Sequence, residues 1–177
     1  MRFKLLSRFF TKSLHTPLRL RESAAVVRAA QREDWAGVIR LIEGYRLSRP
    51  SDALEIGYLG AAYLGLERYE DIVREFEALV ASRNLALVEA MRPYFASALL
   101  WLERNHEALQ QFEKMDGLDA TPAHRALRNW NHAIALYRVG RTDEARHLLL
   151  AEIDSGWPRP EYDQARTLLS SMGVPVH

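Results

Sequence analysis

Histidines and clustered carboxylates are the side chains here that could carry acid–base or metal chemistry, and their spacing favours neither. The histidines are His15, His106, His124, His132, His147 and His177. His106 is followed by Glu107 but lacks the second histidine that a zinc-binding helix requires. The paired acids Glu70-Asp71 and Asp143-Glu144 fall at expected helix starts, where negative charge complements the helix dipole. We therefore expect no catalytic residue, no metal and no cofactor, and a protein that is not an enzyme.

The composition is typical of a globular domain that can bury a core. The chain has 177 residues, of which 48% are hydrophobic and 27% are charged, and this length favours one domain. It contains no cysteine, which excludes disulfides, thiolate metal sites and cysteine nucleophiles. It also lacks any run of about 20 apolar residues, which a membrane-spanning helix would need.

The formal net charge of +1 combines two segments of opposite character. Residues 1–21 hold six basic side chains and no acidic one, whereas residues 22–177 carry a net charge of −5. Phosphate contacts supply most of the nonspecific affinity of proteins for nucleic acids, so a body that binds nucleic acid should be basic. Because this body is acidic, we do not expect nucleic acid as its partner.

The basic segment, residues 1–18, has an amphipathic pattern when it is wound as a helix. An apolar stripe of Phe3, Leu6, Phe10 and Leu14 lies opposite a basic row of Lys4, Arg8 and Lys12. The segment resembles a mitochondrial presequence, and residues 8–13 resemble a processing motif that would place the mature N-terminus near Leu18. The resemblance implies that the targeting residues are Arg2, Lys4, Arg8 and Lys12. Two alternatives stay open, namely membrane-surface contact through residues 1–14 and a cap on the folded domain.

Three later segments repeat one pattern of small and bulky residues, with spacings of 36 and 37 residues. The equivalent sets are Gly60, Ala96 and Ala133; Ala62, Ala98 and Ala135; Tyr63, Leu99 and Leu136; Ile72, Ala108 and Ala145; and Phe76, Phe112 and Leu149. Five positions kept in register predict stacked helical hairpins within residues 19–177. Small residues such as Gly60 are expected where the two helices of one pair cross closely.

Capping and turn residues predict where the helices begin and end. Hairpins are expected over 22–46, 53–79, 89–115 and 122–153, and a closing helix over 161–171. Thr121-Pro122 is expected to supply the N-cap and the first residue of the fourth hairpin. Asp52 and Glu55 have the spacing of a capping box. Pro93 is expected in a first helical turn, where its missing N–H is tolerated. Gly140 is expected to supply a left-handed turn between two helices.

The hairpins resemble those of the tetratricopeptide family over about residues 19–171. The matching residues are Leu59-Gly60, Ala62-Tyr63, Tyr69 and Phe76 in one hairpin, and Asn131, Ala133, Ala135-Leu136, Gly140, Asp143, Glu144 and Ala145 in another. The resemblance implies an all-α fold, a right-handed α-solenoid of about four tetratricopeptide-like hairpins plus a C-terminal capping helix. The pentatricopeptide family has a similar period and would imply binding of organellar RNA, but the acidic body argues against it.

In tetratricopeptide-like proteins the first helix of each pair lines a concave groove, and the resemblance carries that role to eight positions. They are Leu64, Ser97, Trp101, Trp130, Asn131, Ile134, Tyr137 and Arg138. Aromatic and arginine side chains are frequent anchors of protein interfaces, so the aromatic members and Arg138 are the preferred contact residues. The alternative for each aromatic residue is packing between repeats.

Asn131 matches an asparagine with which some members of the family hold the terminal carboxylate of a peptide. The matching positions of the two preceding repeats are Tyr58 and Tyr94, and no basic pair accompanies them. We therefore do not expect a carboxylate clamp.

Together these features predict a non-catalytic scaffold, assembly factor or accessory subunit that grips a peptide or helix of a protein partner. The expected location is the mitochondrion, and within it the matrix. Two alternatives stay open. One is an organellar RNA-binding protein of the pentatricopeptide type, and the other is a tetratricopeptide chaperone or adaptor of the bacterial cytoplasm.

Deletion of residues 2–17 tests whether this segment acts separately from the repeats. If it is a targeting segment, the deletion abolishes delivery to the organelle and leaves the melting temperature nearly unchanged, because no core contact is lost. Fractionation of cells and thermal unfolding of the purified protein measure the two effects. Unfolding of the shortened chain would instead identify the segment as a packed cap.

Overall fold

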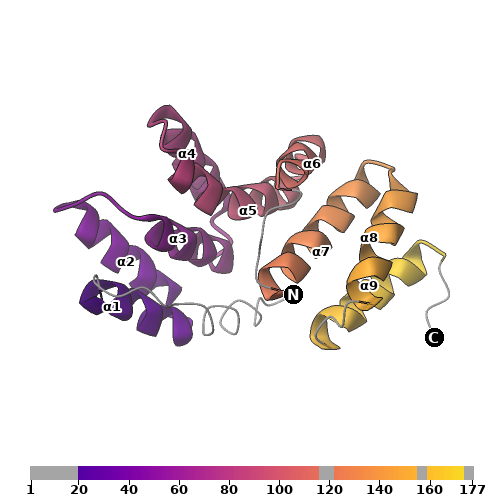
Figure 1. Ribbon diagram of the computed structural model, residues 1–177, viewed down its shortest axis with the longest axis horizontal. Helices are drawn as coiled ribbons and strands as arrows, with labels where there is room; N and C mark the ends of the chain where they lie inside the picture. Colours follow the sequence, from indigo (N-terminus) through magenta and orange to yellow (C-terminus); the bar gives the residue numbers. More distant parts are fainter. Residues whose placement is uncertain (1–19, 116–121, 155–158, 174–177) are drawn as a thin grey trace. The chain divides into compact units, whose positions relative to one another are not determined.

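A computed structural model describes residues 20–115, 122–154 and 159–173, and this part of the chain consists of helices and their connections, without strands (Figure 1). The helices are α1 (Leu20–Gln31), α2 (Trp35–Arg46), α3 (Ala53–Gly65), α4 (Tyr69–Ala81), α5 (Leu85–Trp101), α6 (Asn105–Glu113), α7 (Pro122–Arg138), α8 (Thr142–Asp154) and α9 (Arg159–Ser171). The predicted all-α class is confirmed for the described residues. The predicted targeting residues Arg2, Lys4, Arg8 and Lys12 lie outside them.

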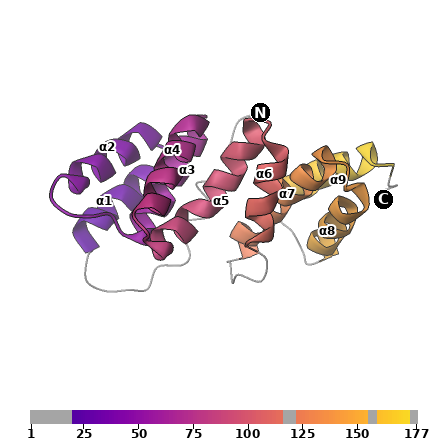
Figure 2. The same ribbon diagram turned by 90° about the horizontal axis from the view of Figure 1, so that it is seen from above.

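The chain divides into two compact units, Met1–Ala98 and Leu99–His177, with the boundary inside α5. In the first unit α1 packs on α2 and α3, α2 packs on α3, and α3 packs on α4. In the second unit α7 packs on α6 and α8, and α8 packs on α9 (Figure 2). Apart from α1 and α3, the helices of each of these pairs follow one another in the sequence, as short connections favour.

Four turns between helices share one backbone geometry. Each contains a residue with positive φ, between 57° and 86°, and these residues are Glu33, Glu67, Glu103 and Gly140. The N–H of the following residue donates to the carbonyl five positions back, at 2.8–3.0 Å, in the pairs Asp34–Ala29, Arg68–Tyr63, Arg104–Leu99 and Arg141–Leu136. This bond belongs to the Schellman motif, which gives partners to carbonyl groups left over at a helix end.

The turn at Gly140 is confirmed, since its φ is 86°. The sequence did not predict the equivalent turns at Glu33, Glu67 and Glu103, because a residue with a Cβ is strained in this region by about 1–2 kcal/mol. The hydrogen bonds of the motif and the packing of the two flanking helices offset this strain. A left-handed turn can therefore recur at positions where the sequence has no glycine to indicate it.

The capping box that begins α3 is also confirmed. The Asp52 carboxylate accepts from the Glu55 N–H at 2.9 Å, and the Glu55 carboxylate accepts from the Asp52 N–H at 3.2 Å. The expected start of the third hairpin is wrong, because α5 begins at Leu85 and Pro93 lies inside the helix. The four residues before position 89 extend the helix by one turn, and Asn84 accepts the first backbone bonds, from Leu87 and Val88.

The core of the first unit is closed by contacts between α3, α4 and α5. Phe76 of α4 stacks on Phe95 of α5 with the ring centroids 3.9 Å apart. A Cβ added to Gly60 would lie 2.5 Å from the Tyr94 ring and 3.0 Å from the Met91 sulfur. The close approach at Gly60 thus involves α5, the first helix of the next hairpin, and the prediction that it involves the second helix of the same hairpin is wrong.

The core of the second unit combines alanines with one aromatic stack. Ala108, Ala133, Ala135 and Ala145 are each 0% exposed, so the helices that carry them approach closely. The ring of His132 stacks on Phe112 with centroids 5.6 Å apart, and His132 is 8% exposed. His132 is therefore part of the core of this unit.

Two glycines of α3 provide a matched test of the Gly60 contact. Gly60→Ala should lower the free energy of unfolding by about 1–3 kcal/mol, because the Tyr94 ring must move. Gly57→Ala should raise it by about 0.5–1 kcal/mol, because alanine favours the helix and nothing lies within 4 Å of the added Cβ. Urea unfolding measures both. Equal effects of the two substitutions would contradict the close approach of α3 and α5.

Candidate functional site

The eight residues predicted to line a binding surface divide between the two units. Leu64 and Ser97 belong to the first unit and are 1% and 5% exposed. The Ser97 hydroxyl donates to the Pro93 carbonyl at 2.9 Å, a bond that serine forms with the preceding turn of its own helix. A partner could reach neither side chain without a rearrangement of the unit.

Three of the six residues in the second unit are also withdrawn from solvent. Asn131 is 3% exposed, and Trp130 and Ile134 are half-buried. These side chains form part of the packing around α7. The alternative reading of Trp130, that it packs within the fold, agrees with its half-buried position.

The other three residues are exposed, and we call them the aromatic–arginine patch. Trp101 is 41% exposed, Tyr137 is 37% exposed, and Arg138 is also exposed. The Arg138 Nη1 donates to the Leu100 carbonyl at 2.9 Å. Leu100 and Trp101 are the last two residues of α5, and Tyr137 and Arg138 are the last two of α7. This bond therefore joins the last turn of α5 to the last turn of α7. A cation beside the carbonyl end of a helix is also favoured by the helix dipole.

Neighbouring arginines of the second unit are already paired with carboxylates. Arg104 donates two hydrogen bonds to Glu107, each 2.8 Å long, and these lower the pKa of Glu107. Arg141 donates to Glu144 at 2.5 Å and to Glu113 at 2.6 Å, and the hydrogen bond from Arg141 lowers the pKa of Glu144. Arg138 has no such carboxylate partner in the described part of the chain.

The positions that match Asn131 in the preceding repeats are occupied by packed tyrosines. Tyr58 is 0% exposed, and burial raises its pKa to about 12. Burial also raises the pKa of Tyr94, whose ring lies against Gly60, and the nearby Tyr58 raises it further. Tyr58 and Asn131 are thus buried within their units, and the Tyr94 ring packs against the backbone of α3 at Gly60.

A buried polar pair in the second unit was not predicted. The Asn129 Nδ2 donates to the Glu152 Oε1 at 2.5 Å and links α7 to α8, and the two residues are 7% and 8% exposed. Both lie in the core-facing register, Asn129 four residues before Ala133 and Glu152 three residues after Leu149. That register was the signal that could have identified them, because a polar residue on a buried face needs a partner.

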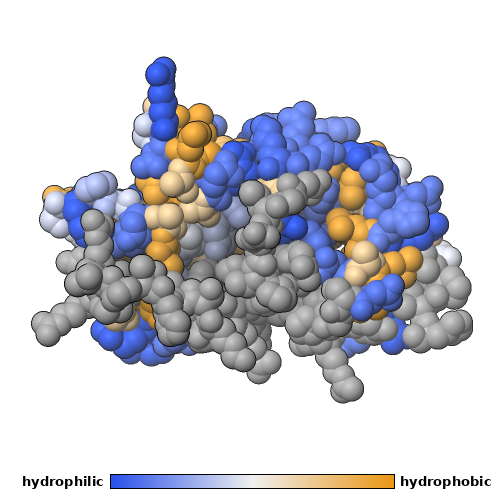
Figure 3. Space-filling view, in the orientation of Figure 1, coloured by the Kyte–Doolittle hydropathy of each residue, from blue (hydrophilic) through white to orange (hydrophobic). Residues whose placement is uncertain are grey.

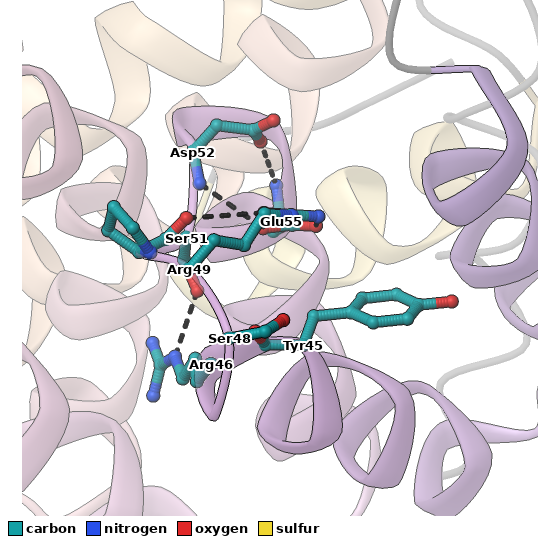
Figure 4. Close-up of polar contacts among 8 residues, drawn as sticks. Tyr45, Arg46, Ser48, Arg49, Ser51, Asp52 and Glu55 are labelled. Atoms are coloured by element: carbon teal, nitrogen blue, oxygen red, sulfur yellow. Dashed lines mark hydrogen bonds and ion pairs between the residues drawn. The ribbon is translucent and has the colours of Figure 1, made fainter.

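A second buried carboxylate lies at the start of α3. Glu55 is 1% exposed, and Arg49 donates to its two oxygens at 2.5 and 2.9 Å (Figure 4). The guanidinium of Arg49 also lies over the Tyr45 ring, 5.4 Å from its centroid. Nearby, Arg46 donates to Ser51 and to Glu75, which ties the α2–α3 connection to α4. Glu55 is thus committed to an ion pair and a helix cap, and this arrangement orders the connection.

Hydrophobic residues are unevenly distributed over the described surface. Figure 3 shows that hydrophobic residues on the drawn face gather over α4 and over α7 and α8, whereas α6 is covered by hydrophilic residues. Within the described residues, histidines and acids nowhere form a group of three that could hold a metal ion. No helix in the same part of the chain has both the length and the apolar character that crossing a membrane demands.

Comparison with known proteins gives no relative from which a function could be transferred. No family model, curated protein or solved structure matches the chain.

The buried hydroxyl of Tyr58 predicts a loss of stability at alkaline pH. The folded-state pKa of about 12 exceeds the ordinary value of 10.0. The contribution of the protonated Tyr58 hydroxyl to the free energy of unfolding is therefore complete below pH 10 and is lost as the pH rises from 10 to 12. The expected loss is about 2–3 kcal/mol. Urea unfolding between pH 8 and 12 should show a smaller loss in Tyr58→Phe, and a still smaller one in Tyr58→Phe/Tyr94→Phe. Parallel curves for the wild type and the variants would contradict this origin.

Proposed function

We propose that the chain is a non-catalytic scaffold, assembly factor or accessory subunit of a larger mitochondrial complex. In this proposal its helices form a right-handed solenoid of about four tetratricopeptide-like hairpins, with α9 as the capping helix. The scaffold binds a peptide or helix of a protein partner. Residues 1–18 direct the chain to the mitochondrial matrix.

The repeated turns support the solenoid. Glu33, Glu67, Glu103 and Gly140 have the same left-handed conformation and are spaced by 34, 36 and 37 residues. The contact of α1 with both α2 and α3 agrees with stacking of consecutive hairpins. In such stacks each hairpin covers the apolar face of its neighbour, and a terminal helix such as α9, which packs on α8, covers the last one.

The observation that carries the binding function is the aromatic–arginine patch. Tryptophan, tyrosine and arginine are the residues that contribute most often to the centre of protein interfaces. Here two exposed aromatic side chains accompany an arginine whose guanidinium is fixed by the Leu100 carbonyl. A side chain that is ordered before binding loses less conformational entropy when the partner arrives.

A comparison of co-purifying proteins tests this function. Tagged wild type and the Trp101→Ala/Tyr137→Ala variant are expressed in the source cells, and bound proteins are quantified by mass spectrometry. We expect partner recovery to fall at least tenfold, since each anchor contributes about 2 kcal/mol or more. The matched control is Leu66→Ala/Val80→Ala, which removes two exposed apolar side chains of the first unit, 40% and 50% exposed, and should retain the partner.

The melting temperatures of both variants must be measured, because an aromatic truncation that opened a cavity would lower stability by about 3–5 kcal/mol. Equal recovery of the partner by the wild type and both double variants would place the contact surface elsewhere. Filter binding to single-stranded RNA at physiological salt distinguishes a protein-binding scaffold from the alternative, an RNA-binding protein. Tight RNA binding without any recovered protein partner would overturn the proposal in favour of an RNA-binding protein.

A further inference from the structure

The aromatic–arginine patch contains a positive charge that the described part of the chain leaves uncompensated. Arg104 and Arg141, the basic residues directly before α6 and α8, form ion pairs with Glu107 and Glu144. Arg138 instead donates to a main-chain carbonyl. Glu103, three residues after Leu100, forms no ion pair with Arg138 within the described residues.

The surroundings of this guanidinium suit a carboxylate. A guanidinium has five N–H donors in a planar fork, and the bond to the Leu100 carbonyl uses one nitrogen, Nη1. The remaining donors can form paired hydrogen bonds with the two oxygens of a carboxylate. Exposed Trp101 and Tyr137 lie at the same two helix ends. Apolar groups that pack there would exclude water and strengthen the charge interaction.

We propose that the patch binds an acidic, partly apolar segment of a partner protein. A bulky apolar side chain of the partner packs against Trp101 and Tyr137, and an adjacent Asp or Glu carboxylate pairs with Arg138. This inference rests on the proposed protein-binding function and specifies the chemistry of the partner. A nucleic acid is a poorer occupant, because its affinity depends on many phosphate contacts and the neighbouring arginines are already paired.

Selection from a random peptide library tests this chemistry directly. Dodecapeptides are displayed on phage with their C-termini fused to the coat protein, so that any selected carboxylate belongs to a side chain. The full-length chain, its Arg138→Gln variant and its Arg40→Gln variant are used as baits. Arg40 is an exposed arginine of α2 that forms no ion pair in the described residues, and its replacement controls for net charge.

We expect peptides selected on the wild type and on Arg40→Gln to be enriched in Asp or Glu beside an aromatic or large aliphatic residue. The best peptide should bind Arg138→Gln at least tenfold more weakly than the wild type by calorimetry. Replacing its acid by the amide should weaken binding to the wild type similarly. A Lys-containing version of the peptide should bind Arg138→Glu better than it binds the wild type, which a general loss of folding would not produce.

The possible failures of the inference are distinguishable from those of the proposed function. Peptides without acidic enrichment, or equal binding to Arg138→Gln, would overturn the inference and leave protein binding intact. Selection of no peptide by the wild type would overturn the inference, and the co-purification experiment would then decide the proposed function separately. Binding of a uridine dodecamer that is lost in Arg138→Gln, without any selected peptide, would identify the patch as a nucleic-acid surface and overturn the inference.

Discussion

The hydrogen bond from the residue after each turn to the carbonyl five positions earlier fixes how two consecutive helices meet. It closes the reversals at Glu33, Glu67, Glu103 and Gly140 within three residues. Because the connection is so short, the two helices it joins are held side by side and pack on each other. The small residues near the helix ends then lie at the closest contacts, and Ala62 and Ala135 are accordingly 0% exposed. The core is thus a consequence of the turn as much as of apolar composition.

The same turns organise the charges. The residue that follows the left-handed position is arginine in three of the four turns, and each arginine pairs with an acid three residues later. The pairs are Arg68–Asp71, Arg104–Glu107 and Arg141–Glu144. Exposed pairs of this kind contribute little stability, but they neutralise the basic side chains at the helix starts. Arg138 lies outside this scheme, because it donates to the Leu100 carbonyl and forms no ion pair within the described residues.

Buried polar groups in both units join helices and their connections. Glu55 is held by Arg49 and by the N–H of Asp52, and Glu152 is held by Asn129. A carboxylate that accepts such hydrogen bonds stays satisfied in a core that would otherwise penalise it. Each of these acids joins two neighbouring helices or orders the start of one. They specify which helix faces pack together. Removing one partner of such a hydrogen bond would leave the other buried without a partner, and its desolvation would then lower stability.

The sequence by itself determined the helical class, the order of the helices, the cap at Asp52 and the turn at Gly140, because each depends on hydrogen bonds and periodicity within a few residues. It did not determine the turns at the three glutamates, whose strain is offset by packing, or the early start of α5. Tertiary structure alone decided which repeat positions meet solvent. Leu64, Leu100 and Tyr137 are equivalent in the repeat, yet the leucines are 1% exposed and the tyrosine is 37% exposed. Exposure depends on what neighbouring helices place over a side chain, and residues distant in the sequence supply that cover.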